Sequence, residues 1–166
     1  MPAVDFIREL DRAETRPPGA FEVAHHLAAG AAHPAILAPA PGRLTWTLPI
    51  PRRATFRAVI APASNAPARV RLGVSDARIY EALAAVDVQP GGGWSPLTAD
   101  LSAYAGWKVS LFYRPEHQAW HVNVSIDAIG GAPARVALGS PEIVTDREAA
   151  GEYAKRRARL TRSEAP

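Results

Sequence analysis

Alternation of apolar and polar residues is the sequence feature that most restricts how this chain can fold. It is clearest near residue 120, where Trp120, Val122, Val124 and Ile126 alternate with His121, Asn123, Ser125 and Asp127. Because successive side chains of a strand point to opposite faces, this pattern predicts one buried face and one polar face. A strand of that kind is typical of an antiparallel sheet with one side in water.

The same period of two recurs in several segments after residue 42 and predicts an all-β fold. We predict strands at 43–50, 55–61, 69–75, 78–89, 108–114, 119–129 and 135–144. Turns separate them at the short intervals of an antiparallel sandwich, and 16 Pro and 12 Gly interrupt the chain too often for long helices. The predicted fold class is therefore an antiparallel β-sandwich, with a core that contains Trp46, Leu72, Val74, Val109, Leu111, Val122, Val124 and Ile126.

Both ends of the chain have helical periodicity. Residues 5–15 combine apolar residues at helical spacing with Asp5 as a candidate N-cap, which predicts a short helix. After Val144, the run Thr145-Asp146-Arg147-Glu148 fits a capping box before a basic helix. We therefore predict an N-terminal helical appendage at 1–20, a sandwich domain at 21–144 and a C-terminal basic helix or linker at 145–166. The basic helix is either a solvated linker or a docking surface for an acidic partner or a following domain.

Charge and composition exclude several classes of partner. The formal net charge is only +3, from 17 Arg, 2 Lys and 16 acidic residues. The sequence contains no basic stripe with interleaved aromatic residues, which is the pattern that would favour nucleic-acid binding. The absence of Cys excludes disulfides and thiolate metal sites. Residues 1–16 lack the apolar core of a signal peptide, and His and Pro interrupt the most apolar window, Val23 to Ala40. We expect a cytoplasmic chain that binds neither nucleic acid nor membrane.

One segment carries a resemblance to a known family. Residues 94–111 read WSPLTADLSAYAGWKVSL: a Trp, a short spacer, an apolar residue, Asp-Leu-Ser, Ala-Gly and a Val-x-Leu strand. This order resembles galactose-binding-like jelly-roll domains, and Leu138-Gly139-Ser140-Pro141-Glu142-Ile143-Val144 is similar to their last strand. The resemblance covers roughly residues 40–144. It implies a jelly-roll sandwich that serves as a carbohydrate-binding accessory domain of sulfatases, glycosidases and surface-polysaccharide enzymes.

The resemblance also implies a structural calcium ion near the first strand. No acidic cluster occupies the matching region, so calcium is unsupported there, but it stays open because backbone carbonyls can supply ligands that the sequence does not reveal. We expect no other cofactor. Catalytic motifs are absent as well. The spacing of His117 and His121 imitates a zinc helix, but Gln118 stands where a Glu is needed, and a strand would separate the two His by about 13 Å. His25, His26 and His33 are expected to be ordinary loop or partly buried residues. With no nucleophile elbow and no paired carboxylates, we predict neither an enzyme nor a metal site.

The polar face of the strand at 119–129 is the candidate binding surface. Imidazole, amide, carboxylate and guanidinium groups form hydrogen bonds with sugar hydroxyls, and an aromatic ring packs on the apolar face of a sugar. Neighbouring strands can add Arg71, Ser110 and Arg114, and nearby loops can add the rings of Trp94, Tyr104 or Trp107. The predicted ligand-binding residues are Arg114, His121, Asn123, Asp127, Trp94 and Trp107.

Two hypotheses about function remain open at the level of the sequence. The first is a non-catalytic carbohydrate-binding module that belongs to a larger polysaccharide-related protein. The second is a structural or protein-interaction domain that positions an attached enzyme, because a sheet with one wet face shows the same alternation without binding a ligand. Saccharide binding distinguishes the two.

Overall fold

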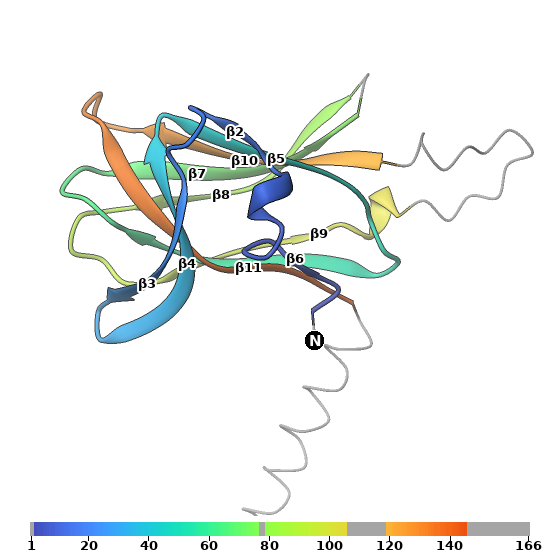
Figure 1. Ribbon diagram of the computed structural model, residues 1–166, viewed down its shortest axis with the longest axis horizontal. Helices are drawn as coiled ribbons and strands as arrows, with labels where there is room; N and C mark the ends of the chain where they lie inside the picture. The colour runs from blue at the N-terminus through green and yellow to red at the C-terminus, as the bar shows by residue number, and fades with distance from the viewer. Residues whose placement is uncertain (1, 77–78, 106–118, 146–166) are drawn as a thin grey trace, which may run out of the picture.

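Two antiparallel sheets, packed face to face, form the body of the protein (Figure 1). A computed structural model describes residues 2–76, 79–105 and 119–145. The five-stranded sheet has the order β2 (Glu14–Arg16), β5 (Gly42–Pro49), β10 (Ala119–Ala128), β7 (Ala68–Ser75) and β8 (Tyr80–Val88). The six-stranded sheet has the order β3 (Glu22–Ala28), β4 (Ala31–Ala40), β11 (Ala134–Thr145), β6 (Ala54–Pro62) and β9 (Ser95–Asp100), and β1 (Val4–Asp5) also pairs with β11. The predicted all-β antiparallel sandwich is confirmed.

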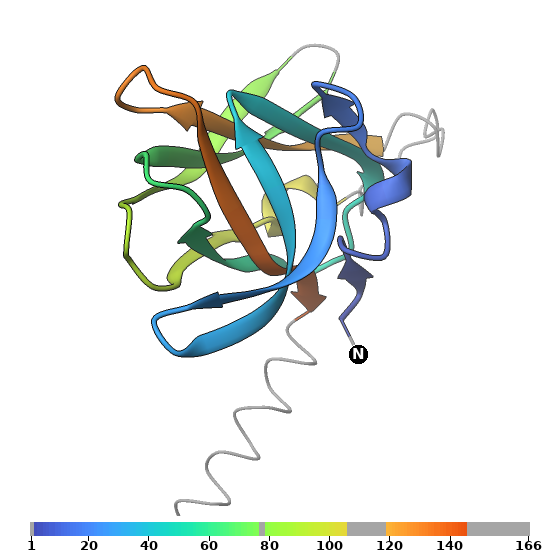
Figure 2. The same ribbon diagram turned by 60° about the vertical axis from the view of Figure 1, so that its left-hand side comes forward.

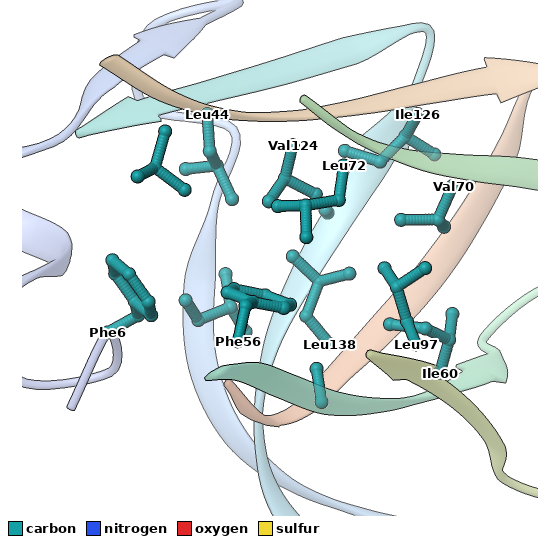
Figure 3. Close-up of a cluster of buried hydrophobic side chains, with 14 of the residues drawn as sticks. Phe6, Leu44, Phe56, Ile60, Val70, Leu72, Leu97, Val124, Ile126 and Leu138 are labelled. Carbon is teal, nitrogen blue, oxygen red and sulfur yellow. The ribbon is translucent and has the colours of Figure 1, made fainter. Parts of the chain in front are cut away.

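The core lies between the two sheets and is built from the apolar residues of the alternating strands. Figure 3 shows Leu44, Leu72, Val124 and Ile126 of the five-stranded sheet facing Phe56, Ile60, Leu97 and Leu138 of the six-stranded sheet. Of the predicted core residues, Trp46, Leu72, Val74, Val122, Val124 and Ile126 are all buried. Val109 and Leu111 lie outside the described residues.

Truncation of Val124 tests this core. Val124→Ala is expected to lower the free energy of unfolding by about 1 to 3 kcal/mol, because methyl burial is lost and a cavity remains. Chemical denaturation measures the change. Val23→Ala is the matched control, since Val23 lies on β3 and is 51% exposed, and it is expected to change stability by less than about 0.5 kcal/mol. Equal effects of the two substitutions would contradict this arrangement of the core.

The predicted N-terminal helix at 5–15 is wrong. Both ends of this segment are strands: β1 pairs with β11, beside which the chain begins in Figure 2, and β2 pairs with β5. Between them lies a single 3-10 turn, η1 (Leu10–Arg12). Asp5, the predicted N-cap, does bind a backbone amide, because its Oδ1 accepts a hydrogen bond of 3.0 Å from the Ile7 amide.

Tertiary contacts explain why the segment is not a helix. Phe6 is fully buried, with its ring 4.6 Å from that of Trp46 and 5.7 Å from that of Phe56 between ring centroids. An isolated helix of this length is marginal in water, so strand pairing at both ends and burial of Phe6 outweigh the helical spacing. Residues 4–16 are therefore part of the sandwich.

Besides β1 and β2, three more strands lie where no strand was predicted, namely β3, β4 and β9. β3 and β4 are rich in Ala, Pro and His, so apolar and polar positions contrast little along them. The predicted strand at 108–114 and the predicted C-terminal helix lie outside the described residues, apart from Thr145, which ends β11. Within residues 2–76, 79–105 and 119–145 there is no α-helix, and hence none long and apolar enough to cross a membrane.

Candidate functional site

The outer face of the five-stranded sheet carries polar side chains in transverse rows. Each row is set by strand register, and its members alternate along their strands with buried core residues. One row contains Thr47, His121, Ser75 and Tyr80, the next contains Glu14, Thr45, Asn123 and Gly73, and the third contains Arg16, Arg43, Ser125 and Arg71. The rows place His121 and Asn123 at the middle of the sheet, because β10 is its central strand.

Asn123 is the anchor of this face. It is only 4% exposed, and its side-chain oxygen accepts a hydrogen bond of 2.8 Å from the Thr45 hydroxyl. Its amide nitrogen donates to Ser75 Oγ at 3.0 Å and to the His121 carbonyl at 3.3 Å. These bonds leave Thr45 Oγ1 with free lone pairs and the Ser75 hydroxyl with a free proton. The buried amide therefore orients one acceptor and one donor on the sheet surface.

A groove of about 340 Å³ opens above this network. Its lining residues are Glu14, Arg16, Arg43, Thr45, Ser75, His121 and Asn123, from strands β2, β5, β7 and β10. The volume lies near the lower end of the range for small-ligand pockets. The groove is thus a polar site with a hydrogen-bonding floor.

An aromatic ring outside the set of predicted binding residues lies beside the groove. Tyr80 is 47% exposed and is the register partner of Ser75. Its phenol lies over Gly73, since a Cβ at residue 73 would be 2.5 Å from the Tyr80 hydroxyl oxygen. The signal in the sequence was Gly73 itself, because an isolated Gly within a strand marks a close approach by another group.

Trp94 lies on the opposite sheet. Its indole nitrogen donates to the Ala31 carbonyl at 2.9 Å, and its ring covers Gly139 of β11, where a Cβ would be 2.6 Å from the ring. His26 and His33 contact the ring edge-on, at centroid distances of 5.7 and 4.8 Å. Trp94 and His121 therefore lie on different outer faces of the sandwich and cannot share one ligand.

The other predicted residues have varied positions. Asp127 pairs with Arg71 at 2.9 Å, and Ser125 is 8% exposed although its strand position faces outward. Tyr104 packs edge-on against Trp120, and burial together with a hydrogen bond to Glu81 raises the pKa of Tyr104 to about 12. Arg114 and Trp107, together with Ser110, lie outside the described residues.

Asp100, Leu101 and Ser102, the Asp-Leu-Ser step of the resemblance, form a turn. Asp100 Oδ1 accepts a hydrogen bond of 2.8 Å from the Ser102 amide. Hydrogen bonds from the Ser102 side chain and backbone lower the pKa of the Asp100 carboxyl. The turn has a structural role at the end of β9.

The carboxylates near the first strand do not fit a calcium ion. Asp5 holds the Ile7 amide and lies 4.0 Å from Arg8, while its register partner Glu142 pairs with Arg57. Each carboxylate is thus engaged by a cation or a backbone donor. Across the part of the chain that the structure describes, no three His, Asp or Glu side chains gather as a metal site would require.

A larger hollow of about 720 Å³ lies between the N-terminal segment and the end of β5. Its lining is mostly apolar, and its four charged residues pair with one another, Arg8 with Asp5 and Arg12 with Glu9. It presents no prearranged polar network comparable to that of Asn123. The smaller groove therefore has the stronger chemical case as a binding site.

Comparisons with known proteins identify the fold. No family model and no curated protein matches the sequence. Among solved structures, the chain resembles TmCBM61 in complex with β-1,4-galactotriose, with a TM-score of 0.53 and 13% identity over 81% of this chain and 87% of that one. It also resembles the C-terminal family 22 carbohydrate-binding module of Clostridium thermocellum Xyn10B, with a TM-score of 0.50 and 14% identity over 87% of this chain and 94% of that one.

A third similar structure is an exo-β-agarase, with a TM-score of 0.57 and 9% identity. The match covers 87% of this chain but only 25% of that enzyme. The sequence identities are low, so the common property is the backbone arrangement. The chain has the β-sandwich fold of carbohydrate-binding modules.

Proposed function

We propose that this chain is a non-catalytic carbohydrate-binding module, an accessory domain of a larger polysaccharide-related protein, and that its groove binds the sugar. The observation that carries the proposal is the buried Asn123 side chain, which holds Thr45 and Ser75 beneath the groove. Likeness in fold to carbohydrate-binding modules supports the same function. Alternation of consecutive strands between two sheets, from β4 to β7 and from β8 to β11, is typical of a jelly roll and supports the galactose-binding-like class.

The groove suits hydroxyl recognition. A sugar hydroxyl both donates and accepts, so it can donate to Thr45 Oγ1 and accept from the Ser75 hydroxyl. His121 is exposed at the same row and adds a ring nitrogen. Tyr80 offers an exposed ring beside these groups for the apolar face of a sugar.

The carboxylates of this face are arranged for binding rather than for hydrolysis. Glu14, Asp87 and Asp127 each pair with an arginine, at 3.0, 2.7 and 2.9 Å respectively. A hydrogen bond from Arg69 lowers the pKa of the Asp87 carboxyl. Asp87, held ionised in this way, cannot serve as the general acid of a glycosidase near neutral pH. We expect the purified protein to show no hydrolase activity.

Titration by NMR with neutral oligosaccharides, including β-1,4-galactotriose, tests the proposed function. Shifts are expected at Ser75, His121 and Asn123, with millimolar to micromolar affinity, because sugar hydrogen bonds replace water hydrogen bonds at small net gain. Tyr80→Ala is expected to weaken binding by about five- to tenfold through loss of ring packing. Ile79→Ala is the control, since Ile79 is its exposed neighbour.

Two outcomes would contradict the proposal. One is the absence of any shift around the groove with every saccharide tested. The other is shifts confined to a surface away from the groove on addition of a protein partner, which would favour the interaction-domain hypothesis. In that case the domain would position an attached enzyme without contacting the polysaccharide.

A further inference from the structure

The groove contains two arginines directly opposite each other. Arg16 on β2 and Arg43 on β5 are register partners, and both line the groove. Like charges at opposing positions of neighbouring strands are destabilising, and here Glu14 offsets the charge of Arg16 through an ion pair of 3.0 Å. Neutral hydroxyl recognition by Thr45 and Ser75 does not require such a pair.

Among the described residues of this face, nearby carboxylates neutralise every arginine except Arg43. Glu14 pairs with Arg16 at 3.0 Å and Asp127 pairs with Arg71 at 2.9 Å. Arg69 is held by both oxygens of Asp87, at 2.7 and 3.0 Å. Arg43 forms no ion pair or side-chain hydrogen bond with any residue that the structure describes. Its guanidinium is an uncommitted cation at the wall of the groove.

The position of Arg43 directs this charge toward a ligand. On one side of Arg43 in its row is Arg16, and on the other is Ser125, which is only 8% exposed. The next residue of the row, Arg71, is engaged by Asp127. Thr45 follows two residues later on the same face of β5, so the charged and the neutral hydrogen-bonding groups border one groove.

We infer that the groove recognises an acidic saccharide, and that Arg43, with Arg16 opposite, binds the carboxylate of a uronic acid or the sulfate ester of a sulfated sugar. This inference rests on the proposed function. A guanidinium presents a planar fork of N–H donors that matches the oxygens of either anion, and such charge-assisted bonds are stronger than neutral ones. The anion also neutralises Arg43, while Thr45 and Ser75 bind a hydroxyl of the same sugar.

The test compares matched charged and neutral ligands by calorimetry and NMR. One pair is tetragalacturonate and its methyl ester, and the other is a sulfated carrageenan tetrasaccharide and the same tetrasaccharide after desulfation. At least one charged ligand is expected to bind about tenfold or more tightly than its neutral partner at low salt, and added salt should reduce the difference. The pair that shows the difference distinguishes a carboxylate from a sulfate.

Arg43→Gln is the decisive variant. It should lower the affinity for the charged ligand far more than the affinity for the neutral ligand, and so remove most of the preference for the charged one. Arg52→Gln is the control, because Arg52 is an exposed arginine remote from the groove lining. An equal loss in both variants would indicate non-specific attraction of polyanions and would overturn the inference.

Different results would overturn the inference about acidic saccharides and the proposed carbohydrate-binding function. If neutral saccharides bind at the groove as tightly as their charged analogues, and Arg43→Gln has no effect, the inference is wrong and the proposed function stands. If no saccharide of either kind shifts the groove resonances, both are wrong. Circular dichroism of each variant checks that the fold is unchanged.

Discussion

Replacing Phe6 with alanine is expected to lower the free energy of unfolding by about 3 to 5 kcal/mol, a large part of the stability of a domain of this size. The ring is fully buried between Trp46 and Phe56, so truncation loses apolar burial and two aromatic contacts. Urea unfolding monitored by tryptophan fluorescence measures the change.

The matched control for Phe6→Ala is Leu27→Ala. Leu27 is 67% exposed on β3, so its truncation is expected to change stability by less than about 0.5 kcal/mol. If Phe6→Ala does not fold, Phe6→Leu keeps most of the volume and should still lower the unfolding midpoint. A Phe6→Ala protein as stable as the wild type would show that residues 4–16 are a dispensable appendage.

Replacing Asn123 with leucine is expected to cost about 1 to 3 kcal/mol of stability and to reduce saccharide affinity at least tenfold. The substitution leaves the inner hydrogen-bonding groups of Thr45 and Ser75 without their buried partner. Thr98→Val, on the outer face of the other sheet, is the control and should affect neither property.

A triple variant separates the two roles of Asn123. Thr45→Val, Ser75→Ala and Asn123→Leu together remove both sides of each side-chain hydrogen bond, and such paired replacement is close to neutral for stability. Stability should therefore return toward the wild-type value while saccharide binding stays lost. Recovery of binding in the triple variant would show that the network supports the fold alone.

Long-range contacts account for most of what the sequence did not reveal. The strands β5, β7 and β10 could be predicted from alternation, because one face of each strand is apolar and the other is polar. β4 lacked that contrast, since Ala35 on its outer side is as fully buried as Ile36 on its inner side. Trp94 covers this outer side, because its ring lies over Gly139, the register partner of Ala35. Trp94 and Gly139 are far apart in the sequence, so no local pattern predicts their contact.

The candidate site was also predicted only in part, because local alternation was visible in the sequence and contacts between strands were not. The alternation correctly placed His121 and Asn123 on the outer side of β10, but burial of Asn123 depends on Thr45 and Ser75 from two other strands. The ring beside the groove is Tyr80, which no spacing relative to β10 could indicate. Trp94, the more obvious aromatic, packs on the other sheet instead.

The central positions of β10 and β11 have a consequence for biosynthesis. β10 lies between β5 and β7, and β11 lies between β4 and β6, so the last two described strands complete the middle of both sheets. While the ribosome is still translating residue 119, each sheet consists of separated strand pairs with open inner edges. The nascent chain must then keep Phe56, Leu72 and other core residues from associating wrongly until Thr145 has emerged. Translational pausing before residue 119 is therefore expected to increase aggregation.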